Sequence, residues 1–174
     1  TALNDGIGIE DIEIWRSDSS STGGNNIRFV NLANSWARNV TSIYAGDSHI
    51  RIENSYACEV RNSICDNAWD VGSGNGYGLY LFSWNSDHLI ENNAVYRARH
   101  SLILEGGGSG CVYTYNYTEG VVSETDRQWL SGDQDTHGVH PYMNLFEGNV
   151  FGKLAHDNTW GSASHNTSYR CWIV

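Results

Sequence analysis

The stretch Leu89-Ile-Glu-Asn-Asn-Ala-Val95 decides the fold, because versions of it return along the whole chain. They are Val40-Thr-Ser, Val60-Arg-Asn-Ser-Ile, Val112-Tyr-Thr-Tyr-Asn-Tyr-Thr and Leu145-Phe-Glu-Gly-Asn-Val-Phe, with an earlier copy at Ile9-Glu-Asp-Ile-Glu-Ile and a last one at Asn166-Thr-Ser-Tyr-Arg-Cys. Most copies alternate apolar and polar residues, which is the pattern of a short β-strand. The pattern predicts a protein built from repeats.

A second family of strands shares the same period. Its members are Ile27-Arg-Phe-Val, Ile50-Arg-Ile-Glu, Leu79-Tyr-Leu-Phe and Leu102-Ile-Leu-Glu, which begin 23, 29 and 23 residues apart. Short strands at this period, without a helical pattern, are typical of a solenoid in which each coil covers the open edge of the one before. The Leu-x-x-Leu-x-Leu frame of leucine-rich repeats is absent, and a β-sandwich would keep no constant register between distant copies.

The aligned repeats place asparagines at one position. Asn93, Asn116 and Asn149 share a column, with Ser63 beside them, and the adjoining column contains Ile90, Tyr113 and Phe146. Amides stacked at the strand spacing of about 4.8 Å bond to the coils above and below, so a polar column is satisfied inside the protein. Asparagine also tolerates the left-handed backbone of a tight corner, and we expect that backbone at these positions.

The stretches Ile50-Arg-Ile-Glu-Asn-Ser-Tyr, His88-Leu-Ile-Glu-Asn-Asn and Met143-Asn-Leu-Phe-Glu-Gly-Asn-Val resemble repeats of the pectate lyase-like superfamily. The resemblance implies an all-β fold, a single-stranded right-handed parallel β-helix of about seven coils. We expect one domain over residues 1–174, and the lack of an initiator methionine suggests a processed part or an excerpt of a longer chain. The superfamily contains lyases, hydrolases, tailspikes and adhesins, so fold alone assigns no activity.

The amino-acid composition limits the classes of partner that the protein is expected to bind. The chain has 10 Lys+Arg against 20 Asp+Glu, and Lys153 is its only lysine. A basic groove for nucleic acid is therefore not expected. No apolar run reaches the roughly 18 residues that a membrane span needs. The 7 Trp, 10 Tyr and 4 Phe argue against disorder.

The loops that connect a strand of the Leu89 family to the next strand of the Ile27 family vary in length, and all the variation falls at one corner of the coil. After Tyr113, the next such strand should lie near 136–139, which makes its loop the longest. Insertions at one corner project from one side of a solenoid, where binding surfaces are usually built. We therefore expect the functional site at the loops 65–77 and 118–137.

These two loops contain the groups that sugar chemistry requires. Tryptophan offers a flat apolar face to a sugar ring, while carboxylates, Arg and His bind hydroxyls or transfer protons. The candidate catalytic residues are Asp66, Asp70, Arg127, Asp133, Asp135 and His137, and the candidate substrate-binding residues are Trp69 and Trp129. Packing of these tryptophans back on the coil, under an acidic surface loop, is the alternative.

No metal site is assigned from the sequence. Four of the seven histidines lie between His137 and His165, but none has the spacing of a strong zinc motif. Calcium held by Asp133 and Asp135 remains open, so the cofactor is unknown. Of the four cysteines, Cys58 and Cys111 align with the His88 coil between them, a separation of about 9.6 Å that exceeds disulfide reach. We expect mostly buried free thiols.

Two functions follow. The first is an extracellular protein, secreted or on the cell surface, that binds or processes a polysaccharide through the two loops. In a lyase, Arg127 or His137 would remove a proton while Asp66, Asp70, Asp133 or Asp135 hold calcium; in a hydrolase, two of the carboxylates would act as acid and base. No catalytic motif of polygalacturonases or pectate lyases is present, so these roles rest on loop position.

The second function is structural, an extracellular subunit that stacks end to end into a filament or forms the shaft of an adhesin or tailspike. Strand-like repeats begin by Ile7 and continue into Arg170-Cys-Trp-Ile-Val174, without a recognisable cap. Uncovered strand edges tend to pair with another copy.

The net charge bears on the first function. A strongly acidic chain binds polyanions poorly, which favours a neutral glycan or a bridging cation for the first function.

Overall fold

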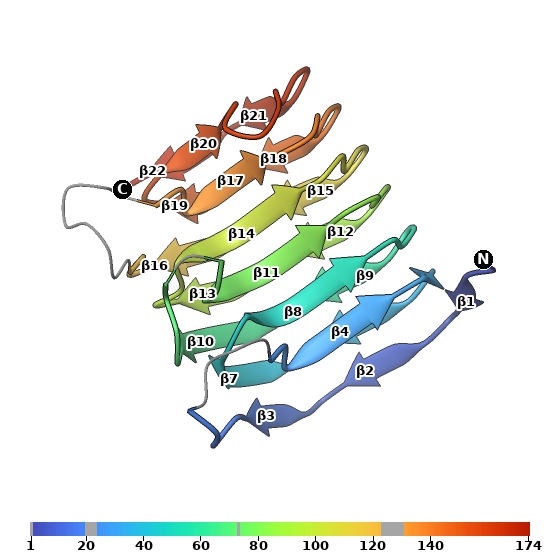
Figure 1. Ribbon diagram of the computed structural model, residues 1–174, viewed down its shortest axis with the longest axis vertical. Helices are drawn as coiled ribbons and strands as arrows, with labels where there is room; N and C mark the ends of the chain where they lie inside the picture. The colour runs from blue at the N-terminus through green and yellow to red at the C-terminus, as the bar shows by residue number, and fades with distance from the viewer. Residues whose placement is uncertain (1, 20–23, 73, 123–130) are drawn as a thin grey trace.

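A computed structural model describes residues 2–19, 24–72, 74–122 and 131–174. These residues form strands and turns and no helix, and every strand pairing among them is parallel. Strands of successive coils lie side by side, from β2 and β3 at the bottom to β21 and β22 at the top (Figure 1). A coil is here one passage of the chain through three sheets. This architecture is compatible with a parallel β-helix.

The first sheet, the β2–β21 sheet, has seven strands. They are β2 (Gly8–Glu10), β6 (Trp36–Arg38), β9 (Glu59–Arg61), β12 (Leu89–Glu91), β15 (Val112–Thr114), β18 (Leu145–Glu147) and β21 (Thr167–Tyr169). Ile90 pairs with Val60 and Tyr113, and Tyr113 with Phe146, as the repeat alignment predicts. The rings of Tyr113 and Phe146 stack with centroids 5.1 Å apart.

The second sheet, the β3–β22 sheet, also has seven strands. They are β3 (Glu13–Trp15), β7 (Thr41–Ala45), β10 (Ile64–Ala68), β13 (Ala94–Tyr96), β16 (Tyr117–Glu119), β19 (Val150–Phe151) and β22 (Trp172–Ile173). The sequence reading merged this sheet with the first, because only two residues separate their strands. The placement of Val40 among the first-sheet copies was wrong, since Ala37 pairs with Val60 and Val40 precedes the second-sheet strand β7.

The third sheet, the β4–β20 sheet, has six strands. They are β4 (Ile27–Val30), β8 (Ser48–Glu53), β11 (Tyr77–Phe82), β14 (His100–Glu105), β17 (Gln134–His137) and β20 (Leu154–His156). The predicted register is confirmed, because Ile50 pairs with both Ile27 and Leu79, and Leu79 pairs with Leu102. A separate pair joins β1 (Asn4–Asp5) to β5 (Leu32–Ala33).

Strand β17 begins two residues earlier than the sequence indicated. Its inward residues are Gln134 and Thr136, both fully buried, which pair with Leu102 and Leu104 of the coil below. The apolar alternation that marks the other third-sheet strands is therefore missing here. Without it, residues 136–139 were the best estimate from spacing, whereas the strand occupies Gln134–His137.

The core is a stack of apolar columns inside the coils. Ile50, Ile52, Leu79 and Leu81 are almost completely buried, in line with the strand alternation. Burial of such side chains contributes about 1.5–3 kcal/mol each. Three of the four cysteines, Cys58, Cys65 and Cys111, are also buried, and all four are free, which confirms the expectation of free thiols.

The corner between the first two sheets is two residues long in every coil. We name the column of Asn93, Asn116 and Asn149 the asparagine ladder. The first corner residue has positive φ, and in the coils of this ladder it is Asn92, Tyr115 or Gly148. The second residue is the ladder residue, Asn93, Asn116 or Asn149, which does not have positive φ. The ladder position is therefore confirmed, but the left-handed backbone that we assigned to it belongs to the residue before it.

The ladder bonds run from coil to coil. Asn116 Oδ1 accepts hydrogen bonds from the backbone N–H and the side-chain amide of Asn93, each at 3.0 Å. Asn116 Nδ2 donates to Ile90 O at 2.9 Å and to Asn149 Oδ1 at 3.0 Å. Each amide thus satisfies groups in the coils on both sides, which is why a polar column is stable in the interior.

The corner between the third and first sheets holds a second polar column that the sequence reading missed. Asn144 Oδ1 accepts from the backbone N–H of Cys111 at 2.9 Å, and Asn166 Oδ1 accepts from that of Asn144 at 3.1 Å. In another coil the acceptor is an imidazole, because His88 Nδ1 accepts from the Cys58 N–H at 2.9 Å.

Candidate functional site

A cleft of about 520 Å³ lies on the outer face of the β4–β20 sheet, and we name it the sheet cleft. Its lining combines aromatic rings, basic groups and carboxylates from several coils. The lining residues are Asp47, Arg51, Gly74, Asn75, Tyr77, Tyr80, Arg99, His100, Ile103, Glu105, Asp135, His137, Asp157, Thr159 and Trp160.

Register places six of these side chains in two outward columns. Arg51 pairs with Tyr80, Tyr80 with Ile103 and Ile103 with Asp135. Two residues further along each strand, the neighbouring column runs from Phe82 through Glu105 to His137. Residues two apart on a strand share a face, so the same alternation that buries leucines on one side presents these groups on the other.

The lower part of the cleft is held by Arg51. Its Nη1 donates to Asp47 Oδ2 at 2.8 Å, and its Nε lies 2.5 Å from Glu53 Oε1. The guanidinium also lies over the rings of Tyr80 and Phe82, at 4.7 and 4.4 Å from their centroids. These contacts fix the Tyr80 ring, whose hydroxyl donates to Glu105 Oε2 at 2.5 Å.

The upper part of the cleft brings together Asp135, His137 and Asp157. One ligand atom from each lies within 4.8 Å of the other two. His137 Nδ1 contacts Asp157 Oδ2 directly. Asp135 is only 5% exposed, and its Oδ1 has no hydrogen-bond partner among the described residues.

Burial and neighbouring charges set the protonation of this part. Burial, together with the nearby Asp157 carboxylate, raises the pKa of Asp135 to about 7. Burial lowers the pKa of His100 to about 4, so its imidazole is neutral near pH 7. His100 Nδ1 donates to Gly132 O at 2.6 Å and lies 3.8 Å from Asp135 Oδ2.

Of the catalytic candidates, Asp135 and His137 line the sheet cleft. Asp133 points elsewhere, into the interior beside the third-sheet strands. It is 1% exposed, and its Oδ2 accepts from Thr118 Oγ1 at 2.5 Å and from the Gly152 N–H at 2.8 Å. Asp133 precedes β17 (Gln134–His137), so the alternation of that strand, which places Asp135 in the cleft, does not extend to it.

The candidates of the loop 65–77 do not line the sheet cleft. Asp66 forms an ion pair with Arg97. Asp70 organises its own loop, because Oδ1 accepts from the Gly72 N–H at 2.8 Å and Oδ2 from Asn75 Nδ2 at 2.7 Å. It thereby positions Asn75, which does line the cleft.

Trp69 stacks on Tyr44, with ring centroids 4.3 Å apart, and its Nε1 donates to Arg16 O at 2.9 Å. It is 38% exposed, so one part of the ring remains accessible. Arg127 and Trp129 lie outside the described residues.

Sequence reasoning missed the strand residues Arg51, Tyr77, Tyr80 and Glu105. It searched the variable loops, whereas Arg51, Tyr80 and Glu105 occupy outward positions of strands whose inward positions were recognised; Tyr77, at the start of β11, has the parity of the inward Leu79 and is not found in this way. The alternation itself was the available signal, since every residue between two core positions faces outward. Asp157 was noticed beside His156 but was not linked to Asp135.

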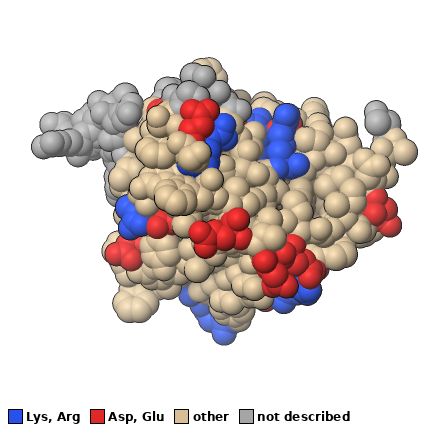
Figure 2. All heavy atoms as spheres, turned by 90° about the horizontal axis from the view of Figure 1, so that it is seen from below, with Lys and Arg blue, Asp and Glu red and all other residues tan. Residues whose placement is uncertain are grey.

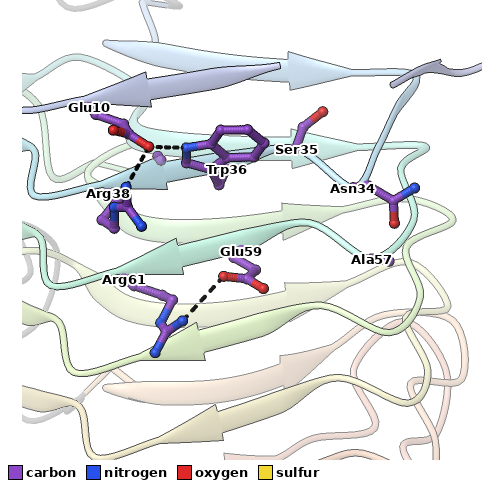
Figure 3. Close-up of a pocket in the computed structure, with 9 residues that line it drawn as sticks. Glu10, Asn34, Ser35, Trp36, Arg38, Ala57, Glu59 and Arg61 are labelled. Atoms are coloured by element: carbon purple, nitrogen blue, oxygen red, sulfur yellow. Dashed lines mark hydrogen bonds and ion pairs between the residues drawn. The ribbon is translucent and has the colours of Figure 1, made fainter. Parts of the chain in front are cut away.

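A second depression, of about 340 Å³, lies on the outer face of the β2–β21 sheet. Glu10 points toward both Trp36 and Arg38, and Arg61 points toward Glu59 (Figure 3). The charged groups of this depression are thus paired with one another. Fewer of them are available to a ligand than in the sheet cleft.

Charge pairing is general on this surface. Seen from the end at which β3 lies, basic side chains sit beside acidic ones (Figure 2). Among the described residues, ion pairs join Arg28 to Glu53 at 2.9 Å and Arg38 to Glu10 at 2.8 Å. The negative net charge of the whole chain is therefore interrupted locally by ion pairs.

Comparison with protein-family models, with curated proteins and with solved structures finds no match for this chain. No described residue belongs to a helix of the length and apolar character needed to cross a membrane. Function must therefore be inferred from the geometry of the site.

Proposed function

We propose that this protein is a right-handed parallel β-helix of about seven coils, of the pectate lyase-like kind, that binds and processes an extracellular polysaccharide in the sheet cleft. Right-handedness is supported by the rule that crossovers between parallel strands of one sheet are almost always right-handed. The seven strands in each of two sheets support the number of coils.

One observation carries the function: aromatic rings and a cluster of proton-transferring groups share one cleft. Trp160 offers an exposed ring face and the buried rings of Tyr77 and Tyr80 form part of the wall, while Asp135, His137 and Asp157 lie together at its upper part. An exposed aromatic face beside polar groups that bind hydroxyls suits a sugar ligand. The cleft also crosses several coils, as a site for a chain-like ligand would.

The two variable loops support the same location. Gly74, Asn75 and Tyr77 of the loop 65–77 line the sheet cleft at one side, and Asp135 and His137 of the loop 118–137 line it at another. Both loops are therefore proposed to contribute to polysaccharide binding through the residues at their ends, which border the cleft.

The test is a panel of neutral and uronate polysaccharides offered to the purified chain. Affinity electrophoresis measures binding, new reducing ends measure hydrolysis, and the ultraviolet absorbance of an unsaturated uronate measures elimination. We expect one class of polysaccharide to retard the chain and to be shortened by it. The variant Asp135→Asn should lose cleavage, whereas Glu59→Gln in the second depression should retain it. Absence of binding and cleavage across the panel would refute the proposal.

A second candidate is end-to-end stacking, which the exposed apolar groups of the outermost coils favour. Trp172, Ile173 and Val174 are 59–69% exposed beside the edge of one terminal coil, and Ile12 and Trp15 are exposed at the other. Negative-stain electron microscopy tests it: filaments of constant width support stacking, and dispersed short rods contradict it.

A further inference from the structure

The topology gathers three metal-binding side chains at one point of the sheet cleft. Asp135 and His137 lie two residues apart on β17 and so share a face. Strand β20 pairs with β17 through Asp135 and Ala155 and through Thr136 and His156. Asp157, the next residue, therefore lies beside His137, and the ligand atoms of the three residues lie within 4.8 Å of one another.

A second, independent observation points to a ligand here. The Asp135 carboxylate is 95% buried, since its exposed fraction is 5%, and its Oδ1 has no partner among the described residues. A buried carboxylate oxygen without a partner is costly, and proteins usually satisfy it with a donor or a cation. The nearest imidazole does not supply a donor, because His100 Nδ1 donates to Gly132 O.

We propose that Asp135, His137 and Asp157 bind one divalent first-row transition cation of the Zn²⁺ or Mn²⁺ class. Imidazole with carboxylates is a ligand set that suits these ions, while Ca²⁺ requires six to eight oxygen ligands. Two ligands of one such ion are about 3–4 Å apart. The three side chains therefore need only small movements to bind it.

The cation would replace the direct contact between His137 and Asp157. Three protein ligands leave at least one coordination position for water or for a group of a bound molecule, and all three residues line the sheet cleft. The inference goes beyond the polysaccharide proposal and does not rest on it, because metal binding requires no sugar.

The experiment is calorimetric titration of the chelator-treated chain with Zn²⁺, then with Mn²⁺ and Ca²⁺, without any polysaccharide. We expect one Zn²⁺ per chain. The variants Asp135→Asn and His137→Gln should each weaken binding by more than roughly 100-fold, the upper end of what loss of an outer-shell partner costs. The matched control is His165→Gln, which removes an exposed histidine outside the cluster and should bind as the wild type does.

Each other outcome overturns the proposal. Equal Zn²⁺ affinity in the wild type and in His137→Gln would assign the metal to surface histidines, and Ca²⁺ binding that does not depend on His137 would refute the class of ion. If a variant does not fold, the wild type alone decides: a specific ion must raise its unfolding temperature, and an unchanged temperature counts against the site. Failure of the sugar panel leaves these readouts intact.

Discussion

The asparagine ladder and the sheet cleft both contain buried polar side chains, but the two regions differ in how completely these side chains are hydrogen-bonded. Asn116 uses both its oxygen and its amide nitrogen in bonds to the coils on either side. Asp135, buried nearly as deeply, keeps one oxygen without a partner among the described residues.

The difference separates a stabilising role from a binding role. A buried polar group that is fully bonded costs little, whereas one without a partner costs about 1–3 kcal/mol. The ladder repeats along the stack and holds the coils in register. In the sheet cleft, the Oδ1 atoms of Asp47 and Asp135 are both buried without a hydrogen-bond partner, and Asp135 lies beside His137 and Asp157, where a cation would compensate it.

The largest effect is expected from breaking the ladder. Asn116→Ala removes the acceptor of the Asn93 backbone N–H, one of the two acceptors of the Asn93 side-chain amide and the amide that donates to Ile90 O, and it opens a small void. We expect the free energy of unfolding to fall by about 4 kcal/mol. Urea denaturation measures it, with the exposed Asn158→Ala as control. A loss no larger than that of the control would show that the ladder bonds are dispensable.

The second prediction concerns the pH dependence of stability and His88, the imidazole in the polar column between the third and first sheets. Burial lowers the pKa of His88 from 6.5 to about 4, and that of His49 likewise. Between these values the unfolded chain binds more protons than the folded chain, so stability is complete above about pH 6.5 and falls as pH drops toward 4. Each histidine should cost about 2 kcal/mol between about pH 7 and pH 5.

His88→Asn tests that assignment, because an amide accepts the Cys58 N–H as Asn144 accepts the Cys111 N–H. The variant should lose about 2 kcal/mol less than the wild type on acidification, measured by urea denaturation at the two pH values. An identical loss in both proteins would place the acid sensitivity elsewhere.

The third prediction has the opposite sign from the first. Above the Asp135 pKa of about 7 the carboxyl is ionised, and Asp135→Asn then removes a buried charge without removing a hydrogen bond. At about pH 8 we expect the chelator-treated variant to be more stable by about 1 kcal/mol in urea denaturation. Asp133→Asn is the matched control: it is equally buried and its Oδ1 also has no hydrogen-bond partner, but its Oδ2 accepts two hydrogen bonds, so the change should destabilise the protein. Destabilisation of both variants alike would remove the distinction between the two aspartates.

The smallest effect is expected at the rim of the cleft. Trp160→Ala removes one ring face and should weaken polysaccharide binding about fivefold. Trp15→Ala is the control, because Trp15 is 67% exposed against 71% for Trp160 but does not line the cleft. Affinity electrophoresis compares them. A larger effect of Trp69→Ala would move the ligand from the sheet cleft to the loop 65–77.

The fold was predictable wherever the pattern is local. Ile50, Leu79 and Leu102 were placed in one column, and Asn93, Asn116 and Asn149 in another, from spacing alone. The pattern failed at β17, where Gln134 and Thr136 replace the apolar residues, and at Val40, where a two-residue corner hid the border between two sheets.

The candidate site was predictable only in part, since Asp135 and His137 were named but their neighbours were not. Tyr80, Glu105 and Asp157 come from three other coils, and nothing in their local sequence sets them apart from other outward residues.

The sequence by itself determined that the strands alternate and stack and that amides form a ladder, because both depend on periodicities within and between neighbouring repeats. Only the tertiary structure decided which outward side chains meet. That depends on contacts between residues as far apart in the chain as Tyr80 and Asp157, which line one cleft, and the periodicity within a repeat does not encode such contacts.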